Sequence, residues 1–282
     1  MMQDNSMTLI YEEYFMKINL IKTAFAGAVF FAGTCAFAID AKTVVQQAHD
    51  VSKPQYTISR VQMDLINKSG AVEESRIITE YGKDINDLTS MVMIFNTPAS
   101  VKDTRFLQIE NKDKDDDKFI YLPTLKQTRR IAASEGTKSF MGTDATYDDM
   151  SSREVEEDNH EMVNENEEKN GYSCWVVKST PKDEKSSQYM YRINWIDKNT
   201  NYPVYSEMYD KKGKLLKTLT LEKLEKKTGE TGKVYDIPTQ EYMKNVQTGH
   251  STRLIILQLK LDSAVPESVF TQNFLNTGKI VK

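Results

Sequence analysis

The sequence predicts a mainly β protein with a few helices, built around a large and strongly curved antiparallel sheet or barrel. Two patterns lead to this prediction. Apolar and polar residues alternate over most of the chain from residue 56 onward, which is typical of strands that bury one face. Turn-forming clusters separate these segments, as at 67–70, 197–200 and 210–213. The chain has 282 residues, 39% of them hydrophobic, and is long enough for one large core.

The first 38 residues are expected to be a secretory signal peptide. After Met16, two lysines precede an uncharged apolar stretch over 23–37, and Ala36-Phe37-Ala38 provides a cleavage site. The stretch is shorter than the ~20 residues that span a bilayer. Acidic residues in the first 15 positions do not suit such a signal, so we expect translation to start at Met16.

Cys35 lies inside this expected signal and leaves a second interpretation open. The Ala-Gly-Thr-Cys sequence is distantly similar to a lipoprotein signal whose cysteine becomes acylated. We favour the simpler interpretation, a cysteine that is removed with the signal. The exported chain, residues 39–282, is then expected to form a single domain.

A short amphipathic helix is expected to open this domain, and about ten strands follow. Asp40 is a suitable N-cap, and Ala41, Val44, Val45 and Ala48 have the spacing of one apolar helix face. The segments with strand periodicity start at Tyr56 and near 91–95, and continue at 104–110, 119–122, 127–132, 172–180, 188–195, 204–209, 215–224 and 253–261.

One charged segment interrupts the strand pattern, and a second one lies within it. Residues 133–169 hold apolar side chains in a loop, and 144–168 carry a net charge of −10, from eleven acidic residues and one arginine. We interpret this stretch as a lid or, equally, as a plain acidic surface loop. Residues 211–227 carry a net charge of +5, from seven lysines and two glutamates. Here a solvated strand face is favoured over a patch for an anionic membrane or a partner.

Composition and motifs exclude several classes of function. Lys and Arg number 37 against 41 Asp and Glu, so the basic excess that nucleic-acid binding requires is missing. Two cysteines and three dispersed histidines do not suit a disulfide scaffold or a metal site. No Gly-rich phosphate or dinucleotide motif occurs, so no cofactor is expected. Without a G-x-S-x-G motif, with His250 in no recognisable context and Cys174 in a strand pattern, we expect no enzyme and no catalytic residue.

Three blocks of sequence resemble a known family in their order and spacing. They are 98–107, then 121–131 with Tyr121-Leu122-Pro123 and an arginine pair, then 139–149 with Ser139-Phe140-Met141-Gly142. The chain resembles the outer-membrane lipoprotein-sorting family, the LolA-like proteins, and the resemblance continues at 195–198, 209–217, 249–252 and 266–271. It implies an incomplete, half-open antiparallel β-barrel with a helical lid, around an apolar cavity that accepts acyl chains.

The resemblance also implies a function. This function is that of a periplasmic carrier, which takes an acylated lipoprotein or lipid from an inner-membrane exporter of the RND or ABC type and delivers it to an outer-membrane acceptor. We expect a monomer. The same fold occurs in periplasmic regulators that sense lipids or lipoproteins and bind a membrane-anchored partner, and this remains the alternative. An esterase acting on lipid is less favoured.

The candidate cavity residues are large, adaptable side chains that alternate along the strands or lie in the lid. An ordinary core is the other interpretation, and strand parity alone does not show which face turns inward. The candidates are Met91, Met93, Phe95, Phe106, Tyr121, Phe140, Met141, Trp175, Tyr191 and Trp195.

Arg129 and Arg130 are candidates for a polar gate. They point to opposite sides of one strand, so at most one of them faces the cavity. There it would donate hydrogen bonds to lid carbonyls or to a headgroup phosphate. A pair of rim arginines with salt-bridge partners is the alternative.

Overall fold

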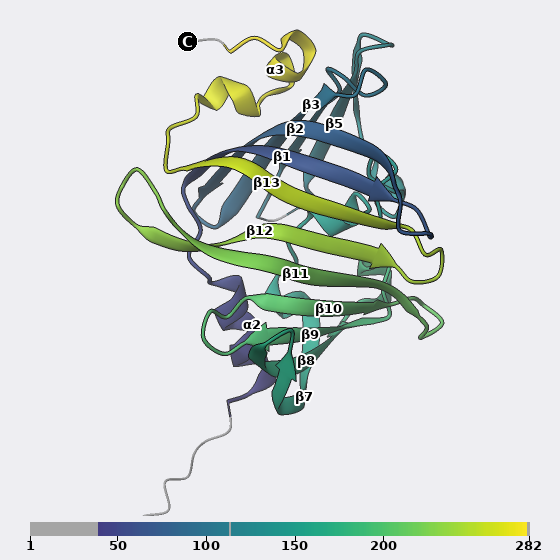
Figure 1. Cartoon of the computed structure of the whole chain (residues 1–282), viewed down its shortest axis with the longest axis vertical. Helices are drawn as coiled ribbons and strands as arrows, with labels where there is room; N and C mark the ends of the chain where they lie inside the picture. Colours follow the sequence, from purple (N-terminus) through teal and green to yellow (C-terminus); the bar gives the residue numbers. More distant parts are fainter. Residues whose placement is uncertain (1–38, 113, 281–282) are drawn as a thin grey trace, which may run out of the picture. The chain divides into compact units, whose positions relative to one another are not determined.

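Thirteen strands form one antiparallel sheet in the residues that the computed structural model describes, 39–112 and 114–280 (Figure 1). The strand order is β6-β5-β4-β3-β2-β1-β13-β12-β11-β10-β9-β8-β7, so the sheet has two edges and is not closed. This confirms the expected incomplete antiparallel barrel. The expected signal peptide, with Met16 and Cys35, lies outside the described residues.

Almost every strand pairs with its neighbour along the chain. The first group is β1 (Tyr56–Ile66), β2 (Val72–Ile85), β3 (Leu88–Thr97), β4 (Arg105–Ile109), β5 (Asp117–Leu122) and β6 (Gln127–Arg130). The second group is β7 (Asp158–Lys169), β8 (Tyr172–Pro181), β9 (Tyr191–Asp197), β10 (Pro203–Tyr209), β11 (Leu215–Thr228), β12 (Val234–Asn245) and β13 (Ser251–Leu261). The two meanders join where β1 pairs with β13.

One long connection departs from this pattern. Residues 131–157, which we call the crossing segment, lead from β6 to β7, the two opposite edges of the sheet. The segment contains three short 3-10 helices, η1 (Ala133–Glu135), η2 (Asp148–Met150) and η3 (Val155–Glu157). A connection between opposite edges must pass over one face of the sheet.

Helix α2 (Ala41–His49) lies on the same face as the crossing segment, and we call this face the inner face. Asp40 caps the helix by accepting a hydrogen bond from the Thr43 amide, as the sequence predicted. Val44 packs against Val177 of β8 and Ile196 of β9. Cross-strand partners lie on one face of a sheet, and a continuous series of partners connects Val177 to Thr252, which contacts the crossing segment: Val177, Asn194, Ser206, Leu219, Met243 and Thr252.

The chain's C-terminal segment covers the outer face of β3 to β5. It contains the 3-10 helix η5 (Glu267–Phe270) and helix α3 (Gln272–Thr277), which Figure 1 shows beside β3. Val269, Phe274 and Leu275 pack on Val92 and Leu107. These two strand residues alternate with Met93 and Phe106, whose side chains therefore point to the inner face.

Three strands were missing from the sequence prediction: β2, β7 and β12. The polar sequence of β7 was included in the expected loop 133–169, so the loop proper ends at residue 157. Strand β12 contains Pro238, which normally argues against a central strand. It is accommodated because the pairing of β11 with β12 shifts register at Leu221/Lys223 and Lys223/Leu224, next to the Leu224–Pro238 pair.

Candidate functional site

The crossing segment covers an apolar cluster on the inner face. Phe140 is 1% exposed, and its ring centroid lies 4.9 Å from that of Phe106 and 5.6 Å from that of Tyr147. We define the inner cluster as the strand residues Met63, Ile78, Met93, Phe95, Phe106 and Ile120 with Ile131, Phe140 and Tyr147 of the crossing segment. The segment therefore supplies part of the core that it covers.

A tight turn presents the apolar side chains of the segment to the sheet. Ser139 and Thr146 form an isolated antiparallel bridge, and the chain reverses between them. Met141 and Gly142 both have positive φ, 53° and 80°. Glycine adopts this conformation without steric cost, whereas Met141 is held in it by the surrounding contacts.

Buried polar side chains of three strands hold the segment by its backbone carbonyls. Arg76 of β2 donates from Nη1 to the Met141 carbonyl at 2.6 Å. Lys118 of β5 donates from Nζ to the Tyr147 carbonyl at 2.7 Å, and Gln108 of β4 donates to the Met150 carbonyl at 3.0 Å. Burial lowers the pKa of Lys118, although nearby aspartates oppose this shift. These three single hydrogen bonds hold the backbone of the segment against the sheet in place of a continuous ladder of backbone hydrogen bonds.

Two aspartates of the segment bind the opposite meander. Asp149 lies 2.8 Å from Lys217 Nζ of β11, and their side chains are 8% and 5% exposed. Burial alone would raise the pKa of Asp149, but the charge and hydrogen bond of Lys217, together with hydrogen bonds from Thr146 and Tyr189, outweigh burial and hold this pKa low. Asp144 accepts a hydrogen bond from Thr252 Oγ1 at 2.7 Å and lies 2.8 Å from His250 Nδ1. The acidic stretch thus includes buried anchors as well as solvated residues.

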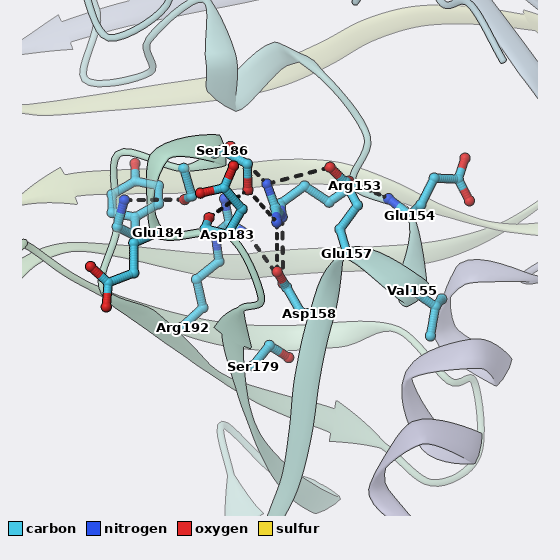
Figure 2. A network of polar contacts seen from close by, with 12 residues as sticks. Arg153, Glu154, Val155, Glu157, Asp158, Ser179, Asp183, Glu184, Ser186 and Arg192 are labelled. Atoms are coloured by element: carbon cyan, nitrogen blue, oxygen red, sulfur yellow. Dashed lines mark hydrogen bonds and ion pairs between the residues drawn. The ribbon is translucent and has the colours of Figure 1, made fainter. Parts of the chain in front are cut away.

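Figure 2 shows the polar network at the C-terminal end of the segment. Arg153 Nη2 contacts Asp158 Oδ1 at 2.6 Å, and Arg153 Nη1 donates to the Ser186 carbonyl at 3.0 Å. Ser186 ends the 3-10 helix η4 (Glu184–Ser186), which precedes β9. Arg192 of β9 approaches the same aspartate, with 3.9 Å between Nη1 and Oδ2.

Six of the ten apolar residues predicted for the cavity meet at this site. Met93, Phe95, Phe106 and Phe140 belong to the inner cluster, and Met91 and Met141 pack against it. The inner face here is filled by side chains of the crossing segment.

The other four residues lie elsewhere. Tyr121 is on the outer face under the C-terminal segment, and Trp175 packs near α2. Trp195 donates from Nε1 to Glu167 at 2.7 Å, and Tyr191 stacks on Tyr209 with 4.4 Å between centroids.

The predicted arginine pair sits at the sheet edge. Arg129 contacts Glu135 at 2.8 Å and Arg130 contacts Asp117 at 2.7 Å, and both arginine side chains are exposed. Sequence reasoning missed Arg76, Lys118 and the Asp149–Lys217 pair, which hold the segment. For Lys118 and Lys217, a cation at an inward position of an otherwise apolar strand face is the signal that marks them. Cys174 is buried, which raises the pKa of its thiol to about 11.

Two polar clefts flank the crossing segment. The larger, of about 660 Å³, lies between the β4–β5 hairpin, the segment and residues 185–188. The smaller, of about 360 Å³, is lined by Asp144, Lys217 and His250 among others. Within the described part of the chain, no cluster of His, Cys, Asp or Glu is arranged to hold a metal ion, and no helix is long and apolar enough to cross a membrane.

Comparison with solved structures identifies the fold as LolA-like. A domain described as an outer membrane lipoprotein-sorting protein from Vibrio parahaemolyticus is 29% identical, with a TM-score of 0.75, over 84% of this chain and 98% of that one. A DUF1329 family protein from Desulfovibrio piger is 26% identical, with a TM-score of 0.75, over 83% and 97%. A LolA superfamily protein from Nitrosomonas europaea shares the fold at 19% identity, with a TM-score of 0.62, over 84% and 100%.

The comparison with family models defines the chain further. Residues 87–277, more than half of the chain, match the model described as "-like: Uncharacterized protein", and the chain belongs to this family. No curated protein matches the chain.

Proposed function

We propose that the protein is a periplasmic carrier that binds the acyl chains of a lipoprotein or lipid on its inner face and moves them from the inner to the outer membrane. The observation that carries this proposal is the inner cluster, which is covered by a segment held mainly through its carbonyls and two aspartates. The similarity to the Vibrio parahaemolyticus lipoprotein-sorting domain supports it.

In this mechanism the crossing segment exchanges with the ligand. The proposed closed state is the arrangement in which Phe140 and Tyr147 occupy the inner face. When the segment moves away, an acyl chain takes the place of these rings. Burying ~14 methylenes gains ~11 kcal/mol at ~0.8 kcal/mol each, and a bilayer offers nearly the same. A covering segment that competes for the same surface lowers the net affinity, so that release at an acceptor becomes feasible.

The wider assignment follows from the same proposal. Residues 39–282 act as one domain and one monomer, without catalysis or cofactor. An exporter of the RND or ABC type in the inner membrane supplies the cargo, and an acceptor in the outer membrane removes it.

The direct test is native mass spectrometry of the chain purified from a bacterial periplasm, followed by organic extraction and lipid identification. One acylated molecule per chain supports a carrier. A chain that is isolated empty, and that takes up no added phospholipid or acylated peptide, contradicts the proposal and favours a regulator that binds a membrane-anchored protein.

A matched pair of variants locates the binding face. Phe140→Ala opens space in the inner cluster and should increase the affinity for a fluorescent fatty acid. Phe274→Ala removes an equally buried ring, 2% exposed, from the outer face and should leave this affinity unchanged. An equal effect of both variants on affinity would place the binding site elsewhere.

A further inference from the structure

Arg192 is a largely buried cation without a hydrogen bond. Its side chain is 25% exposed, and its closest contact to a carboxylate is the 3.9 Å separation from Asp158, which is beyond hydrogen-bond distance. Its guanidinium also lies over the Tyr189 ring, 5.0 Å from the centroid. No acceptor for its N–H groups lies among the described residues. A guanidinium carries five donors, and those of Arg192 remain available to solvent or to a ligand.

The carboxylates near Arg192 form closer pairs with other cations, Asp158 with Arg153 and Asp149 with Lys217. Asp158 is engaged by Arg153 at 2.6 Å, and Glu157 lies 3.8 Å from the same guanidinium, so both of these carboxylates pair with Arg153 (Figure 2). Burial, followed by the repulsion from Arg153, lowers the pKa of Arg192. An arginine remains charged in a protein nevertheless, and this one has no carboxylate within hydrogen-bond distance among the described residues.

Arg192 lines the larger cleft, of about 660 Å³. Lys118 and Ile131 line the same cleft. Ile131 is a member of the inner cluster, so the cleft adjoins the face on which we place the acyl chain. A ligand with its chain on the inner face would have its polar end in this cleft.

Several carboxylates of the cleft are engaged by donors or cations of the protein. Asp116 accepts hydrogen bonds from Gln108 and from Ser151. Glu157 accepts one from the Glu154 amide, and Asp148 lies in the field of Lys118. These acids are therefore poorly placed to neutralise Arg192, and a ligand anion is the partner that its environment lacks.

We propose that this cleft is the headgroup subsite of the carrier and that Arg192 binds the phosphate of a phospholipid. The planar guanidinium fork matches two phosphate oxygens. This inference rests on the proposed function, because the acyl chain of the same molecule must lie on the inner face.

Three probes separate the contributions of phosphate and chain. Lysophosphatidylglycerol has both, a monoacylglycerol of the same chain length lacks the phosphate, and glycerol phosphate lacks the chain. Isothermal titration should show that the protein binds lysophosphatidylglycerol most tightly. Arg192→Gln should weaken this binding about tenfold, equivalent to ~1.4 kcal/mol, and leave monoacylglycerol binding unchanged. Arg60→Gln, at an exposed position of β1, is the control and should change neither affinity.

Several outcomes would overturn the inference. Equal losses for both lipids in Arg192→Gln would show that Arg192 only supports the fold. Equal wild-type affinities for the two lipids would exclude a phosphate subsite and leave the proposed function intact, whereas binding of neither lipid would contradict both. Glycerol phosphate that binds as tightly as lysophosphatidylglycerol would indicate a site for free phosphate. If Arg192→Gln does not fold, Arg192→Lys keeps the charge, removes the fork and should still weaken lysophosphatidylglycerol selectively.

Discussion

Lys217, a charged side chain on the inner face, has its partner in the crossing segment, and this determines what it contributes to stability. Lys217 and Asp149 form a buried pair between β11 and the segment. Removing one partner of such a pair leaves an uncompensated buried charge. Breaking the pair should therefore cost much more than breaking a pair on the surface.

Lys217→Met should lower the free energy of unfolding by about 3–5 kcal/mol, because Asp149 would remain buried without its cation. Urea denaturation followed by circular dichroism measures the change. Lys226→Met is the control, since Lys226 is 72% exposed beside Asp236 and a surface pair contributes about 0–1 kcal/mol. Similar losses in the two variants would mean that Lys217 is better solvated than its position implies.

Glu80 of β2 makes stability depend on pH. It faces Met93 across the pair β2–β3, so it lies on the inner face. Burial, and secondly the charge of Glu241, raise its pKa from 4.5 to about 7. The folded state thus binds the proton more tightly than the unfolded state, so Glu80 does not lower the free energy of unfolding below pH 4.5. As the pH rises from 4.5 through 7, ionisation of Glu80 lowers the free energy of unfolding by at most about 3 kcal/mol.

Glu80→Gln should therefore stabilise the protein at pH 8 and have almost no effect at pH 4.5. Urea denaturation at the two pH values gives the comparison. Glu225→Gln provides the control, because hydrogen bonds from Thr239 and Lys223 lower the pKa of Glu225 and no gain at pH 8 is expected. A gain from Glu80→Gln that is the same at both pH values would be a packing effect and not a charge effect.

Elements with strong alternation were predictable from the sequence, and elements without it were not. Met91, Met93 and Phe95 alternate with polar or outward-facing residues, and their strand and shared face follow from period two. Strand β7 has little apolar pattern because it is an edge strand with few buried positions. The position of the crossing segment on the sheet was not predictable either, because Arg76 and Asp149 contact residues that are distant from them in the sequence.

The crossing segment should open more easily than the strands beneath it. Its backbone is held by single bonds from Arg76, Lys118 and Gln108 and not by a continuous ladder. Segments of this kind open locally at low free energy.

In Arg76→Met, amide hydrogen exchange over 133–150 should accelerate several-fold while exchange in β8 to β10 stays unchanged. Arg253→Met, which removes an outer pair with Glu222, is the control and should leave 133–150 unchanged. Uniform acceleration throughout the sheet in Arg76→Met would indicate global destabilisation and contradict a separate opening.

At the scale of the whole described body, the two meanders are joined in two ways. Strand β1 pairs with β13 over most of their lengths. The crossing segment contributes Phe140 to the first meander and Asp149 to the second. This arrangement couples the folding of the two halves, because neither retains its inner-face partners if the other unfolds.

The sheet should therefore unfold as one cooperative unit, and the positions of the tryptophans allow a test. Trp175 and Trp195 both lie in the second meander, so their fluorescence reports on that half. Ile78→Ala removes a side chain that is 1% exposed in the first meander and should cost about 2–5 kcal/mol. The fluorescence midpoint in urea should shift as far as the midpoint measured by circular dichroism, whereas Val72→Ala, at a site 55% exposed, should shift neither. If Ile78→Ala moves only the circular dichroism midpoint, the two meanders unfold separately and the coupling through β1, β13 and the crossing segment is weak.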